Sequence, residues 1–284
     1  MLSVQRDAVR AHVWLYFWSA WVQPLVPFMA DLKVHGHKRM AGNHFMPKLS
    51  VCKPSRTTML PPVKRSVLGL VAYCLLVAAD SLQKRAVAFY DPNVGGGSML
   101  NNAGSGGGEP LNVIVSGLSS SAVLTDAGIL NYARAIGFST ECLGIHLGDP
   151  QSANLGDGHG FVNQTMELRQ DYGNAELGTC LESLIGGNHF RVYRQNGPMA
   201  NSKALFLAVS KEEDVNKHHT IVPDGYNIGR DQLVTNALGK KTFKGVHYST
   251  VGQNVTGLLP AGNAGVNHGI ATDGITTLLT VTII

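Results

Sequence analysis

Histidine, arginine and aspartate residues between positions 189 and 231 are the chain's best candidates for a chemically active cluster. In the run NHFRVYR, His189 and Arg191 share one face of a predicted strand, because alternate strand residues point the same way. Arginine can grip a carboxylate or phosphate with paired hydrogen bonds, and histidine can act as acid, base or metal ligand. The candidates are His189, Arg191, His219, Asp224, Arg230 and Asp231. The competing interpretation is a solvated strand face or a set of internal ion pairs.

Other motifs point less clearly to chemistry. Ser119 lies between a predicted strand and a predicted helix, as a hydrolase nucleophile does, but GLSSS lacks that motif's closing glycine. Helix capping by Ser119 or Ser120 is therefore favoured. The sequence contains no His-Glu-x-x-His or Cys-x-x-Cys string, and no Gly-Lys-Ser/Thr follows its glycine-rich stretch. It thus assigns no catalytic residue, no metal and no cofactor.

The elements that would position the cluster indicate a single α+β domain over residues 110–284, with a mixed β-sheet, about two main helices and many loops. Strands are predicted from short β-branched apolar runs, and helices from apolar residues three and four apart. The predicted strands are 111–115, 161–170, 188–194, 204–210, 220–222 and 275–284, and the predicted helices are 122–136 and 228–238.

Residues 59–79 have the features of a secretory signal peptide. Lys64 and Arg65 precede an uncharged apolar run, which ends in small residues up to Ala79. We therefore expect cleavage after Ala79 and a secreted, extracellular protein.

The flanking segments follow from that assignment. Residues 80–109 are expected to be a pro-segment, with a dibasic cleavage site ending at Arg85, followed by a flexible glycine-rich linker. Residues 1–58 are expected to be a gene-model extension or disordered. If they are translated, the apolar stretch 13–30 could instead anchor the protein to a membrane.

Charge and cysteine usage agree with export. Residues 1–85 contain 12 Lys and Arg against 3 Asp and Glu, whereas residues 86–284 contain 11 against 16, so the mature part is acidic and nucleic-acid binding is not expected. Removing the signal would leave Cys142 and Cys180, an even pair expected to form a disulfide. Asn163 and Asn254 lie in glycosylation sequons.

Several runs in this chain resemble the LssY C-terminal domain. They are PLNVIVSG, NHFRVYRQNG, ALFLAVSKEED, HHTIVPDGYNIGRDQLV and ATDGITTLLTVTII, in that order over most of 110–284. The family's motif positions fall here on His189, Arg191, His219, Pro223, Asp224, Arg230, Asp231, Thr272, Asp273 and Gly274. The chain is also similar to uncharacterised secreted fungal proteins. The resemblance implies an α+β fold but no activity, and the phosphatase motifs of the family's frequent partner domain are missing.

Two functions are compatible with these observations. The first is a secreted binding or accessory module for a polar or anionic ligand. The second is a secreted hydrolase of phosphoesters or lipids, with or without a metal ion, using the same cluster. A hydrolase requires these groups to converge within a few ångströms around a cavity.

Overall fold

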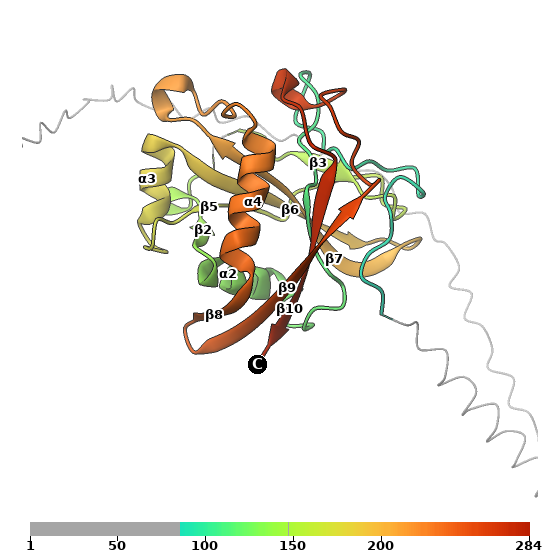
Figure 1. The fold of residues 1–284 in the computed structure, drawn as a ribbon, viewed down its shortest axis with the longest axis horizontal. Helices are drawn as coiled ribbons and strands as arrows, with labels where there is room; N and C mark the ends of the chain where they lie inside the picture. Colours follow the sequence, from blue (N-terminus) through green and yellow to red (C-terminus); the bar gives the residue numbers. More distant parts are fainter. Residues whose placement is uncertain (1–85, 147) are drawn as a thin grey trace, which may run out of the picture. The chain divides into compact units, whose positions relative to one another are not determined.

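The computed structural model describes residues 86–146 and 148–284 (Figure 1). The predicted signal peptide, residues 1–58 and the cleavage sites at Ala79 and Arg85 lie outside the described residues. Within the described ranges, no helix has the length and apolar character needed to cross a membrane.

One large mixed sheet organises the domain and confirms the predicted α+β class. Its strands run in the order β2-β5-β6-β7-β1-β10-β9-β8, and only the β1–β10 pair is parallel. Their bounds are β1 Val113–Val115, β2 Phe138–Thr140, β5 Met166–Gln170, β6 Gly187–Asn196, β7 Asn201–Glu212, β8 Gly239–Phe243, β9 Val246–Thr256 and β10 Ile275–Ile283. A small second sheet pairs β3 (Ser152–Asn154) with β4 (Phe161–Asn163).

In the part of the chain that the structure describes, three helices accompany the sheet: α2 (Asp126–Ala135), α3 (Gly178–Ile185) and α4 (Gly225–Ala237). Three short 3₁₀ turns are η1 (Cys142–Gly144), η2 (Val215–Lys217) and η3 (Asn267–Gly269). The structure splits the predicted strand 161–170 into β4 and β5, and it reduces the predicted strand 220–222 to one bridge at Ile221. The helix α3 was not predicted.

Helices α2 and α4 cover one face of the sheet (Figure 1). Alternation along the strands sends Val113 and Val115 into this layer, where they join the helix residues Ile129 and Leu233. Gly229 allows α4 to lie close against β7, because a Cβ there would come within 2.8 Å of the Ser210 backbone.

Loops cover the opposite face, together with α3 near β5, and the loop packing corrects the predicted linker. Met99 is buried in a second core together with Ile114 and Phe206, and Leu100 forms a bridge to Pro110. The glycines allow close backbone packing here: a Cβ on Gly97 would lie 2.3 Å from the Asn154 carbonyl oxygen. Residues 91–109 therefore belong to the domain.

The capping prediction at Ser119 and Ser120 is wrong. Thr125 caps α2, accepting a hydrogen bond from the backbone N–H of Gly128. Ser119 and Ser120 instead accept hydrogen bonds from backbone N–H groups of the last strand, at Val281 and Ile283. They tie the loop before α2 to β10.

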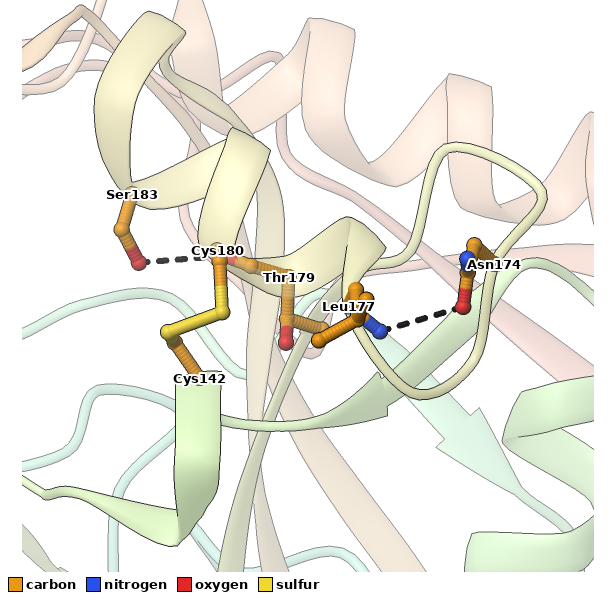
Figure 2. The surroundings of a disulfide bond; sticks show 6 residues. All are labelled: Cys142, Asn174, Leu177, Thr179, Cys180 and Ser183. Atoms are coloured by element: carbon orange, nitrogen blue, oxygen red, sulfur yellow. Dashed lines mark hydrogen bonds between the residues drawn. A yellow bond between two sulfur atoms is a disulfide. The ribbon is translucent and has the colours of Figure 1, made fainter.

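The predicted disulfide is present. Cys142 and Cys180 are bonded, and the bond joins η1 to α3 (Figure 2). It closes a loop with a sequence separation of 38 residues.

Candidate functional site

Three of the six predicted cluster residues come together on the loop-covered face of the sheet. His189 and Arg191 both project from β6 to this face, as their spacing predicts. The Arg191 Nη1 lies 2.9 Å from Nε2 of buried His189 and must donate to it, because a guanidinium has no acceptor. Glu212 links the two histidines: its carboxylate oxygens lie 3.4 Å from His189 Nδ1 and 3.5 Å from His219 Nδ1.

The centre of the site is Arg169, which the sequence did not single out. Strand β5 places Arg169 directly opposite His189 in the sheet register. Its guanidinium contacts four carboxylates, at 3.6 Å from Glu141, 2.8 Å from Glu167, 3.2 Å from Glu182 and 3.0 Å from Glu212. The second arginine, Arg191, contacts Glu109 at 2.8 Å and Glu167 at 3.1 Å.

The charges of this assembly do not balance. We call it the charged cluster, and it comprises Glu109, Glu141, Glu167, Arg169, Glu182, His189, Arg191, Glu212 and His219. Five carboxyl groups face two guanidinium groups, an excess of three negative charges if every carboxyl is ionised. Most of these side chains are buried, where an uncompensated charge is costly.

Protons relieve part of that excess. Burial raises the pKa of Glu212 to about 7, against the lowering effect of Arg169. Burial likewise raises the pKa of Glu182. Burial, reinforced by nearby arginines, lowers the pKa of both histidines: that of His189 falls well below its usual value, and that of His219 falls as well. Near neutral pH the cluster therefore contains neutral histidines and a Glu212 carboxyl that exchanges its proton.

A pocket of about 270 Å³ opens the cluster to solvent. Its lining residues are Glu141, Cys142, Ile145, Arg169, Ser183 and His219. The Arg169 side chain is 17% exposed, so the pocket reaches the middle of the cluster.

Two triads in this region have the residue types of a metal site. They are Glu182–His189–Glu212, which is buried, and Glu141–His146–Glu167, which is more open. The buried triad fits a metal poorly. Arg169 already donates to both of its carboxylates, and Arg191 occupies His189 Nε2, which leaves the proton of the neutral ring on Nδ1. That nitrogen is the one facing Glu212, and a metal would need its lone pair.

The other three predicted residues lie elsewhere, so the single six-residue cluster is corrected. Helix α4 packs on the opposite face of the sheet and carries Arg230 and Asp231. Buried Arg230 binds Asp273 with two hydrogen bonds of 2.6 and 2.8 Å, and it also binds Asp231. Asp224 precedes the helix and accepts a hydrogen bond from Asn227. These residues fix α4 to the turn before β10.

A second, larger hollow of about 600 Å³ lies between α4 and the helix-covered face of the sheet. Asp231 is one of its lining residues, together with Gln170, Asn188 and Lys211. The hollow thus contains one predicted residue but none of the histidines.

The two predicted glycosylation sites lie on the surface of the domain. Asn163 on β4 and Asn254 on β9 are exposed, as glycan acceptors need to be.

Comparison with known proteins finds no matching family model, no matching curated protein and no matching solved structure. The resemblance to the LssY C-terminal domain therefore stays a prediction.

Proposed function

We propose that this domain is a secreted binding module whose pocket accepts a positively charged, hydrogen-bond-donating group. The observation that carries the proposal is the engagement of Arg169 by four carboxylates at the floor of the pocket. A guanidinium so engaged has little left to offer an anion. An incoming anion would also meet the excess of carboxylates, so we retain the polar ligand expected from the sequence and drop the anionic one.

The size and walls of the pocket support a small cationic group. A volume of about 270 Å³ lies just below the usual range for small-molecule sites, so it suits one side chain or head group. Glu141 forms part of the wall; its side chain is 14% exposed, and its carboxylate also contacts His146 Nδ1 at 2.8 Å. In the reduced dielectric of a protein surface, a carboxylate attracts a nearby cation with a Coulomb energy of several kcal/mol. The cost of removing water from the cation and the carboxylate offsets part of that energy.

Methylguanidinium and inorganic phosphate test the sign of the site. We would titrate each into the full chain at pH 8 and follow amide chemical shifts by NMR. Methylguanidinium should bind saturably, and Glu141→Gln should weaken it at least fivefold. Asp224→Asn, which removes an exposed carboxylate outside the pocket lining and outside α3, is the matched control for net charge. Saturable phosphate binding without methylguanidinium binding would refute the proposal.

A hydrolase is the second candidate, and one observation favours it. Glu212 has a pKa raised to about 7 and lies 3.5 Å from His219 at the pocket, which is how a general acid or base is placed. Hydrolysis of p-nitrophenyl phosphate or p-nitrophenyl butyrate should then show an inflection near pH 7 that Glu212→Gln removes. No turnover of either ester above buffer would leave the binding module as the explanation.

The export proposal has its own test. We propose that the mature chain begins at Asp80 or Ala86 and carries glycans on Asn163 and Asn254. Intact mass and N-terminal sequencing of secreted protein, before and after deglycosylation, would show both. A chain beginning at Met1 in a membrane fraction would favour the anchored form instead.

A further inference from the structure

The outer face of α3 is apolar and open to solvent. Leu177, Leu181, Leu184 and Ile185 recur four, three and one residues apart and are 42% to 60% exposed. This spacing places them on one side of the helix. The opposite side carries Glu182, which is fully buried against Arg169. The helix therefore presents to water the kind of stripe that helices ordinarily bury.

The disulfide holds a turn with two more exposed apolar side chains beside α3. Cys142 lies next to Leu143, and the bond to Cys180 holds that turn against α3, where Leu177 is also seen (Figure 2). Leu143 is 74% exposed and Ile145 is 58% exposed. Leu143 also has a φ of 53°, a backbone conformation that costs a non-glycine residue free energy. We call these six residues the apolar patch: Leu143, Ile145, Leu177, Leu181, Leu184 and Ile185.

The apolar patch borders the charged pocket. Ile145 belongs to both, and Ser183, the neighbour of Leu184, also lines the pocket. A ligand that filled the pocket with a cationic group would therefore lay its adjoining part across leucine and isoleucine side chains.

The charges around the apolar patch favour a basic protein partner over an anionic lipid surface. The segments 141–146 and 174–186 contain Glu141, Glu176 and Glu182 but no lysine or arginine. The neighbouring turn η2 carries Lys217, which is already paired with Glu213 at 3.1 Å. A face with so few unpaired basic residues lacks the attraction that draws peripheral proteins to anionic lipid surfaces. It complements a basic partner instead. Partner surfaces that combine arginine with apolar side chains are common at the energetic centres of protein interfaces.

We infer that the pocket and the apolar patch together bind one segment of a partner protein in which an arginine or lysine is flanked by apolar residues. The basic side chain enters the pocket beside Glu141, and its neighbours cover α3 and η1. This inference rests on the proposed cation-binding function, and it adds the identity of the partner's flanking residues.

Three acetylated, amidated peptides separate binding by the cationic pocket from binding by the apolar patch. They are Leu-Leu-Arg-Leu-Leu, Leu-Leu-Gln-Leu-Leu and Ser-Ser-Arg-Ser-Ser. Each is titrated into the full chain by isothermal calorimetry. The first should bind at least tenfold more tightly than either of the others. Replacing both Leu181→Asp and Leu184→Asp should abolish that advantage while leaving the serine-flanked peptide unchanged. Val94→Asp, at another highly exposed apolar position, should change neither.

The outcomes are distinguishable. If the serine-flanked peptide binds as tightly as the leucine-flanked one, the apolar contribution is refuted and the cationic pocket stands. If no arginine peptide binds and methylguanidinium also fails, the proposed function itself is refuted. Self-association of the unmodified protein that the two leucine replacements abolish would assign the patch to a second copy of this chain and overturn the inference. Finally, equal binding of the three peptides to the protein, together with their binding to vesicles made only of anionic lipid, would show nonspecific adhesion. That result would also overturn the inference.

Discussion

Replacing Arg169 with methionine is the most direct test of how the charged cluster is held together. The change preserves much of the side-chain length but removes the one cation shared by Glu141, Glu167, Glu182 and Glu212. Removing one partner of a buried ion pair costs about 3–5 kcal/mol, because it leaves an uncompensated charge. The 17% exposure of Arg169 admits some solvent, so we expect the lower part of that range at pH 8.

The loss should depend on pH in a definite direction. Arg169 lowers the pKa values of Glu182 and Glu212, so its removal raises both further. Protonated carboxyl groups no longer repel one another, and the penalty of Arg169→Met should therefore shrink as the pH falls. Urea denaturation should give a loss of about 3 kcal/mol at pH 8 and less than half of that at pH 5.

Controls make this prediction refutable. Lys217→Met removes an exposed ion pair to Glu213, and it should cost at most about 1 kcal/mol at either pH. Arg169→Lys retains a charge and serves if the methionine variant does not fold. A loss below about 1 kcal/mol for Arg169→Met at pH 8, or the same loss at both pH values, would refute the account of the cluster as a charge-compensated assembly.

Further perturbations follow from the same contacts. Glu212 has a folded-state pKa near 7 against an ordinary value of 4.5. The stabilisation of the folded state by its protonated carboxyl is therefore fully present below pH 4.5 and is lost as the pH rises through 7. Urea denaturation should show up to about 3 kcal/mol of that loss, and Glu212→Gln should flatten it; an unchanged pH profile would contradict the shift. Serine at both Cys142 and Cys180 opens a loop of 38 residues and should cost about 4 kcal/mol, visible as a lower melting temperature that reductant no longer changes. Arg230→Lys cannot reproduce the paired hydrogen bonds to Asp273 and should cost about 1–3 kcal/mol in urea; a cost no greater than that of an exposed lysine change would show that α4 is fixed by packing alone.

The central strands were predictable because their sequence pattern matches their environment. The apolar runs at 188–194 and 204–210 become the long strands β6 and β7, which are buried on both faces. Helix α3 was missed because it is only eight residues long, lacks a capping side chain and exposes its apolar residues. The glycine-rich segment was misjudged because glycine serves close backbone packing as well as flexibility, and sequence alone does not distinguish these uses.

The candidate site was predictable only in part, for a topological reason. Alternation along one strand correctly placed His189 and Arg191 together. It could not show that β5 would bring Arg169 opposite His189, because register between strands depends on pairing across the fold. Nor could it show that Arg230 would lie across the sheet from them, since residues close in sequence can occupy opposite faces once a helix intervenes.

The composition of the charged cluster favours a role in binding over a role in stability. Elsewhere the same sheet is filled on both faces by ordinary apolar side chains, including Val192 and Phe206 on the central strands. Well-packed apolar residues commonly match or exceed the stability of a buried ion cluster of similar volume. An excess of carboxylates is also poorer at stabilising a fold than a balanced set, because part of it must be neutralised by protons, as the pKa of Glu212 near 7 indicates. What this arrangement provides that an apolar core would not is a polar pocket lined by Glu141 and Arg169, beside a helix whose leucines face water.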